Sequence, residues 1–193
     1  MTNAKATSTD IVSGQVSRAG GSVAQAVGGG VFHVVCLDAS GNVKWDSKSP
    51  NLVVNVGLQD MAQQYFKGVN YTASWYVGLY GAAASNTPNE NDTAASHGGW
   101  TEVAPYGNAT RAVCTFGTAT LADPSVLSNS ASPASFNVNA AAIVGGAFLI
   151  SDSTKFGTTG ILFSAADFAA PGDRTVVPGD TVTVTYTFSL AAA

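Results

Sequence analysis

The stretch VFHVVCLDASGNVKWDSKSP (residues 31–50) carries the pattern that decides the fold. Its first seven residues form an apolar run, and residues 38–42 then supply the Asp, Ser, Gly and Asn that favour a tight turn. Residues 43–46 alternate between apolar and polar side chains, which is the two-residue period of a strand. These features predict an antiparallel β-hairpin that ends at Pro50, because proline lacks a backbone donor.

One amphipathic helix is expected after this hairpin. Residues 52–56 are predicted to form a further strand, and from Leu58 the apolar spacing lengthens from two residues to three or four. Lys67 suits the last turn of a helix, and Gly68 suits its end. The predicted helix has an apolar face made of Leu58, Met61, Ala62, Tyr65 and Phe66.

Every segment after this helix has the pattern of β-structure. The clearest is TVTVTYTFSL (residues 181–190), in which apolar side chains occupy one face and Thr or Ser the other. Residues 74–80 carry large side chains on both faces, which predicts a central strand of a packed sheet. The other predicted strands are residues 111–116, 135–139, 143–150 (with a bend at Gly145-Gly146) and 158–164.

These elements define the expected fold class and domains. Eight to ten strands and one short helix predict an all-β protein, an antiparallel β-sandwich of jelly-roll type formed by residues 30–193. Residues 1–29 are rich in glycine and should form an extended N-terminal arm that does not fold alone. Residues 81–110 and 119–133 have the composition of long loops, and loops of that length commonly serve binding.

Charge and composition narrow the class of partner. The formal net charge is −4, charged residues make up 10% of the chain, and the eight Lys and Arg are scattered along it. Nucleic acid and anionic membranes are therefore poor partners. The N-terminus lacks a signal-peptide core, and no apolar run approaches the ~20 residues that span a bilayer, so we expect a soluble protein made in a cytoplasm.

One segment contains the residue types of a hydrolase. Asp92, Ser96, His97 and Glu102 lie within eleven residues, as the segment 92–102 reads DTAASHGGWTE. Adjacent Ser and His side chains in an extended loop generally diverge, and the chain contains no Gly-x-Ser-x-Gly elbow. We interpret the segment as a structured surface loop and expect no enzyme, with a hydrolase as a minor alternative.

No metal or cofactor site is expected. The two histidines, His33 and His97, have no second ligand at zinc spacing, and the turn Asp38–Asn42 has too few carboxylates for calcium. His33 is predicted to be a strand residue with a hydrogen bond. Cys36 and Cys114 both fall in apolar strand patterns, so they are expected to be buried free thiols rather than a disulfide.

Several short segments resemble a family of tailed-bacteriophage virion proteins. They are residues 34–45, 51–58, 73–79, 92–102 and 130–137, which together spread over roughly residues 31–165. The resemblance implies a structural component of the phage particle, a capsid decoration (cement) protein with a jelly-roll-like fold and no catalytic residues. It implies the major capsid protein and other copies of this chain, as a dimer or trimer, as partners. The location would be the capsid surface of the virion, after synthesis in the host bacterial cytoplasm.

An alternative function uses two aromatic residues of the predicted long loop. Trp100 and Tyr106 lie in a glycine-rich segment, and exposed aromatic rings there could stack on a sugar. The chain would then be a phage tail or fibre component that recognises a host-surface glycan. Single aromatic residues in such loops are more often anchors for loop packing or for a subunit interface.

Overall fold

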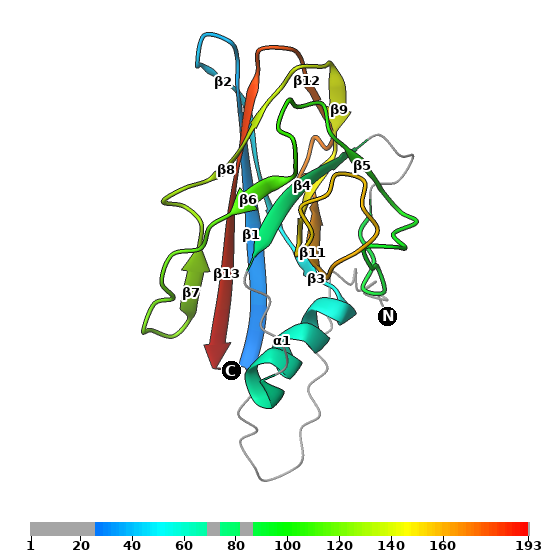
Figure 1. Ribbon diagram of the computed structural model, residues 1–193. Coiled ribbons are helices and arrows are strands. Elements are labelled where there is room, and N and C mark those ends of the chain that lie inside the picture. The colour runs from blue at the N-terminus through cyan, green and yellow to red at the C-terminus, as the bar shows by residue number, and fades with distance from the viewer. Residues whose placement is uncertain (1–25, 69–73, 82–86, 193) are drawn as a thin grey trace, which may run out of the picture.

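The computed structural model describes residues 26–68, 74–81 and 87–192 of the 193-residue chain. These residues form two antiparallel β-sheets packed face to face, with one short helix at one end (Figure 1). The predicted all-β class, the antiparallel β-sandwich and the single short helix are thereby confirmed for the described residues.

The first sheet joins the two ends of the described chain. Its strand order is β2-β1-β13-β7, and β8 also pairs with β13. Residues Ala26 to Leu37 pair along their whole length with residues Thr181 to Ala192, in register from Ala26–Ala192 to Leu37–Thr181. Such pairing between distant segments is typical of Greek-key and jelly-roll sandwiches. The strands of this sheet are β1 (Ala26–Leu37), β2 (Val43–Pro50), β7 (Ser125–Ser128), β8 (Ala134–Asn137) and β13 (Thr181–Ala192).

The second sheet has the order β3-β11-β10-β4-β5, and β6 also pairs with β4. A two-stranded pair of β9 with β12 lies beside the sandwich. The strands of the second sheet are β3 (Leu52–Val53), β4 (Trp75–Gly81), β5 (Thr101–Val103), β6 (Ala112–Cys114), β10 (Gly146–Ile150) and β11 (Leu162–Asp167). The small pair consists of β9 (Ala142–Val144) and β12 (Arg174–Val176).

The main core lies between the sheets. On β13 the inward side chains of Val182, Val184 and Tyr186 are fully buried, while the Thr residues between them are partly exposed. The alternation predicted for residues 181–190 is confirmed over these positions. Opposite them, Val77 and Leu79 of β4 are also fully buried.

The outer face of the second sheet is buried as well. Tyr80, Phe148 and Ile150 point away from the main core and form a second cluster with Ala94 and Trp100, which lie in the chain before β5. Part of the predicted long loop therefore covers this sheet as a third layer. The prediction that β4 is central, with bulk on both faces, is confirmed.

The helix begins earlier than predicted. α1 spans Asn55–Lys67, and β3 contains only Leu52 and Val53, so the expected strand over residues 52–56 is wrong in its second half. Gly57 lets the first turn of the helix pack against β11, since a Cβ there would lie 2.5 Å from the carbonyl oxygen of Phe163. The predicted end is confirmed, because Gly68 adopts a left-handed conformation with φ of 61°.

Several strand boundaries also differ from the expectation. The predicted loops 119–133 and 81–110 contain the short strands β7 and β5, and β12 was not predicted. Residues 143–150 divide at Gly145 into β9 and β10, which confirms the predicted bend. β1 begins at Ala26, so residues 26–29, which we expected in the N-terminal arm, pair with β13. The rest of the predicted arm, residues 1–25, lies outside the described residues.

Candidate interaction surface

The segment Asp92–Glu102 is organised around a buried tryptophan. The indole Nε1 of Trp100 donates a hydrogen bond of 2.9 Å to Asp92 Oδ2, and the same oxygen accepts one from the backbone N–H of Asn89. The Trp100 ring packs 5.0 Å from the rings of both Tyr80 and Phe148. Asp92 thus closes the loop that covers the second sheet.

The four hydrolase-type residues do not form a catalytic relay. His97 stacks on Trp100 at 3.9 Å, and its Nδ1 lies 3.0 Å from the carbonyl oxygen of Trp100. Ser96 is exposed and bridges to Thr93 through backbone hydrogen bonds. Within the described residues no hydrogen bond joins Ser96 to His97. The geometry fits the interpretation of a structured loop pinned by its side chains.

Glu102 takes part in a buried ion pair instead. Arg111 donates to Glu102 from Nε at 3.0 Å and from Nη2 at 2.7 Å, and both side chains are almost completely buried. Arg111 also donates to the carbonyl oxygens of Asp152 and Gly157, while Glu102 accepts the backbone N–H of Phe156. This network fixes the loop after β10 to β5 and to the start of β6. Sequence reasoning missed Arg111, because nothing in its local sequence distinguishes it from an exposed arginine.

The two aromatic residues of the glycan alternative are interior. Trp100 is 3% exposed and Tyr106 is 2% exposed. Tyr106 packs edge-on to Phe136 with ring centroids 4.7 Å apart, and the Lys155 ammonium lies 4.5 Å from its centroid. Neither ring has a free face on which a sugar could stack. Both residues anchor loops.

The β1–β2 turn is held by its aspartate. Asp38 Oδ1 accepts hydrogen bonds from the backbone N–H groups of Ser40 and Asn42, and the bond from Asn42 is the main reason why the pKa of Asp38 is lowered. Gly41 supplies the positive φ that the turn requires. No group of three or more potential metal ligands occurs among the residues that the structure describes.

The remaining polar candidates also lie in structural positions. His33 lies in β1, as predicted. Its Nε2 is 3.5 Å from Asp46 Oδ2 and has no hydrogen-bond partner among the described residues, contrary to the expected hydrogen bond. Cys36 and Cys114 are buried and free, as predicted. Burial raises the pKa of Cys36 to about 11 and that of Cys114 to about 12, so both are weak nucleophiles at neutral pH.

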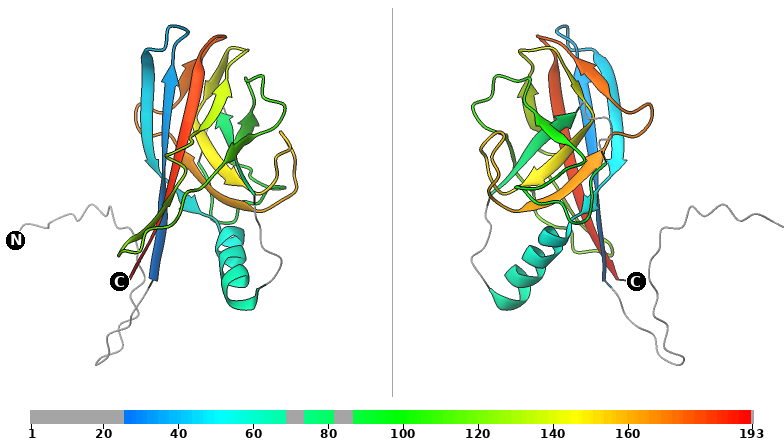
Figure 2. Two further views of the ribbon diagram at one scale, coloured as in Figure 1. Left: turned by 60° about the vertical axis from the view of Figure 1, so that its left-hand side comes forward. Right: turned by 90° about the vertical axis from the view of Figure 1, so that its right-hand side faces the viewer.

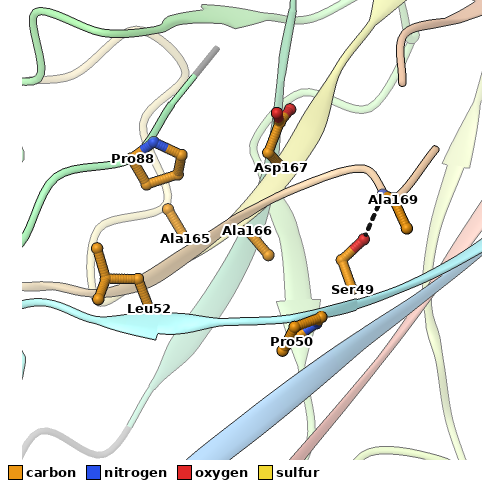
Figure 3. Close-up of a pocket in the computed structure, with 8 residues that line it drawn as sticks. All are labelled: Ser49, Pro50, Leu52, Pro88, Ala165, Ala166, Asp167 and Ala169. Atoms are coloured by element: carbon orange, nitrogen blue, oxygen red, sulfur yellow. Dashed lines mark hydrogen bonds between the residues drawn. The ribbon is translucent and has the colours of Figure 1, made fainter. Parts of the chain in front are cut away.

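A shallow pocket of about 200 Å³ lies where β2 and β3 meet β11. Figure 3 shows small or apolar side chains around it, with the hydroxyl of Ser49 accepting a hydrogen bond from the backbone N–H of Ala169. Asp167 supplies the one carboxylate of its lining, and partial burial together with the charge of Asp173 raises the pKa of Asp167. One carboxylate without a second polar partner does not make a catalytic centre.

A more apolar pocket opens at the end of the sandwich where α1 lies. Its volume is about 170 Å³, and it lies between the sheets. Leu149, Phe163 and Tyr186 form its buried floor, and its other side chains are partly exposed. Below, "apolar pocket" means the site lined by Met61, Trp75, Phe116, Leu127, Leu149, Phe163, Tyr186 and Phe188.

Beside this pocket, α1 presents its apolar face to solvent. The predicted apolar face is largely exposed, with Tyr65 at 82% and Phe66 at 81%, whereas Gly57 and Asp60 are the residues buried on the helix. An isolated amphipathic helix on a domain usually buries its apolar side, whereas here Met61 is the residue of the predicted face that packs against the core. We define the α1 stripe as Leu58, Ala62, Tyr65 and Phe66, all of which are exposed.

Both features lie at one end of the molecule. Figure 2 shows α1 at the end of the sandwich where β1 begins and β13 ends. The apolar pocket and the α1 stripe therefore form a candidate interaction surface, here called the α1 end. No helix in the described part of the chain is long and apolar enough to cross a membrane.

Comparisons with known proteins found no match for this chain. No family model matches the chain, and neither a curated protein nor a solved structure matches it.

Proposed function

We propose that this chain is a structural protein of a tailed-bacteriophage particle, a decoration or cement protein that binds the capsid lattice. The observation that carries the proposal is the α1 stripe, in which two neighbouring aromatic side chains are more than four-fifths exposed beside an open apolar pocket. Exposed apolar patches of this kind mark surfaces that contact another protein. The sequence resemblance to virion proteins supports the same class of function.

The polar groups of the described chain support a contact protein over an enzyme. Asp92, Glu102 and Arg111 are committed to structural hydrogen bonds, and the two thiols are buried. The burial of Trp100 and Tyr106 weighs against the glycan-binding alternative, which relied on those two rings. The proposed partners are the major capsid protein and other copies of this chain.

Binding to capsid shells tests the proposal. The full chain is expected to co-sediment with shells of the phage whose particle carries it, and Tyr65→Ser/Phe66→Ser is expected to weaken this binding at least about tenfold. Removing two large apolar side chains from an interface costs on the order of 1.5–3 kcal/mol for each side chain. Because both rings are exposed, the variant should unfold at the same temperature as the parent chain.

The matched control replaces two exposed apolar residues at the opposite end of the sandwich. Val43 is 65% exposed next to the β1–β2 turn, and Ile143 is 46% exposed in β9 (Figure 1). Val43→Ser/Ile143→Ser should bind shells like the parent chain. Equal binding by the α1 variant, or no binding by the parent chain, would overturn the proposal.

A further inference from the structure

The apolar pocket is too small for a typical small-molecule ligand. Pockets that enclose drug-sized ligands have volumes of roughly 300–1,000 Å³, whereas this one has about 170 Å³. The hydroxyl of Tyr186, one of its lining residues, already accepts a hydrogen bond of 2.8 Å from Asn51 Nδ2. The pocket therefore suits one or two aliphatic side chains from a polypeptide.

The chain itself carries a segment with suitable side chains. The 25 residues before β1 are mostly small or polar, and their large apolar residues are Ile11, Val12, Val16 and Val23. Ile11 and Val12 are adjacent, β-branched and compact enough for a pocket of this size. Val12 precedes Ala26 by fourteen positions (26 − 12), which allows a reach of roughly 45 Å when extended.

The chain enters the sandwich close to the pocket. Gly30 of β1 pairs with Phe188, which lines the pocket, and β1 begins four positions earlier at Ala26. Four strand residues span roughly 13 Å. The segment that precedes Ala26 thus starts at the α1 end, within easy reach of a pocket on a copy that faces this end.

We propose that the apolar pocket of each copy receives Ile11 and Val12 from a second copy, so that two copies exchange N-terminal segments at their α1 ends. A second copy is favoured over the same chain because β1 runs from this end into the body. A segment that prolongs the line of β1 beyond Ala26 would lead away from its own pocket and toward a facing copy. The exchange is self-complementary, as a two-fold dimer requires.

The charge difference agrees with this occupant. Residues 1–25 contain Lys5 and Arg18 against Asp10, a net charge of +1, so the remaining chain carries −4 − 1 = −5. The inference deepens the self-association part of the proposed function. It is measured without capsid shells, so its failure and that of the proposed function can be told apart.

Cysteine pairing distinguishes exchange from self-docking. Val12→Cys and Leu127→Cys are made in separate full-length chains. The native thiols Cys36 and Cys114 should not form disulfides under these conditions, because both are buried. Mixing the two variants under mild oxidation is expected to give a disulfide-linked heterodimer on a non-reducing gel. A double variant that forms the disulfide within a single chain would overturn the exchange, as would no Val12–Leu127 disulfide in either experiment.

A second experiment does not alter the folded body. Ile11→Asp/Val12→Asp in the full chain should weaken dimerisation at least about tenfold in sedimentation equilibrium and shift the emission of Trp75, which lines the pocket. Thr7→Asp/Ser8→Asp introduces the same charge into the same segment without removing apolar side chains, and it should leave both signals unchanged. A parent chain that is monomeric at all concentrations, or equal effects of the two variants, would contradict the inference.

Discussion

Arg111 and Glu102 form a two-pronged ion pair inside the protein, with N–O distances of 3.0 and 2.7 Å. A buried charge that loses its partner destabilises a fold by roughly 3–5 kcal/mol. Arg111→Leu should lower the free energy of unfolding by about that amount, because Glu102 and the carbonyl oxygens of Asp152 and Gly157 lose their donors. Chemical denaturation measures the effect. The control Lys48→Leu, at an exposed position, should change the free energy of unfolding by less than about 0.5 kcal/mol. A loss below about 1 kcal/mol for Arg111→Leu would show that the ion pair is unimportant for stability.

Two buried tyrosines should respond in opposite ways to loss of their hydroxyl groups. Tyr106 is 2% exposed and its hydroxyl has no hydrogen-bond partner among the described residues, whereas the hydroxyl of fully buried Tyr186 is bonded to Asn51. An unsatisfied buried polar group costs roughly 1–3 kcal/mol. Tyr106→Phe should therefore leave the melting temperature unchanged or raise it, and Tyr186→Phe should lower it. The reverse order would mean that Tyr106 has a partner after all.

A glycine on β4 makes room for an aromatic ring on β10. Gly78 pairs with Phe148, and a Cβ at Gly78 would lie 2.1 Å from the Phe148 ring. Gly78→Ala should cost roughly 1–3 kcal/mol by overpacking. In a Phe148→Leu background the same change should cost clearly less, since the ring is gone, and a double-mutant cycle measures this coupling. Equal costs in the two backgrounds would contradict the packing described here.

Acid should weaken the fold partly through Asp180. Burial alone raises the pKa of this carboxyl, but hydrogen bonds from Lys44 and from the backbone of Val177 outweigh it, so the pKa lies below its ordinary value of 3.8. A folded-state pKa below the unfolded one stabilises the protein above pH 3.8, and this stabilisation is lost as the pH falls through the folded value.

Asp180→Asn isolates that contribution to acid sensitivity. The variant should be less stable than the parent chain at pH 7 and should lose less stability on acidification, as measured by urea unfolding between pH 7 and pH 2. Some acid sensitivity should persist through Asp38 and Asp152, whose pKa values are lowered mainly by hydrogen bonds from Asn42 and Thr159. Parallel pH profiles for the variant and the parent chain would exclude a role for Asp180.

The elements that could be predicted from sequence are those in which burial follows a local period. In residues 181–190 each apolar side chain has a Thr or Ser neighbour, so one buried face is enough to define the strand. Asp38 and Gly41 likewise specify their turn through local hydrogen bonds and a positive φ. The sandwich class followed from such segments.

The missed elements depend on contacts between distant segments. Val54, Asn55 and Val56 have strand-like composition, yet α1 begins at Asn55, and Gly57 packs closely against Phe163 of β11. Trp100 was expected mainly as an anchor for loop packing, but its enclosure by Asp92 and the outer face of the second sheet could not be predicted. No local pattern reveals such a third layer.

The solvent exposure of the apolar face of α1 could not be predicted from local sequence patterns either. The period of Leu58, Tyr65 and Phe66 identified one apolar face of the helix. Whether that face meets the core or solvent is decided by the packing of Gly57 and Asp60 against the sandwich. The residues of the candidate surface could thus be named from the sequence, whereas their availability could not.

Electron cryomicroscopy of the intact phage particle tests the central claim most directly. We predict density for the two-sheet body on the outer capsid surface, with Tyr65 and Phe66 of α1 covered by the capsid lattice or by a neighbouring copy. Density for this chain at the tail, its absence from the particle, or an α1 end that faces open solvent would contradict the account.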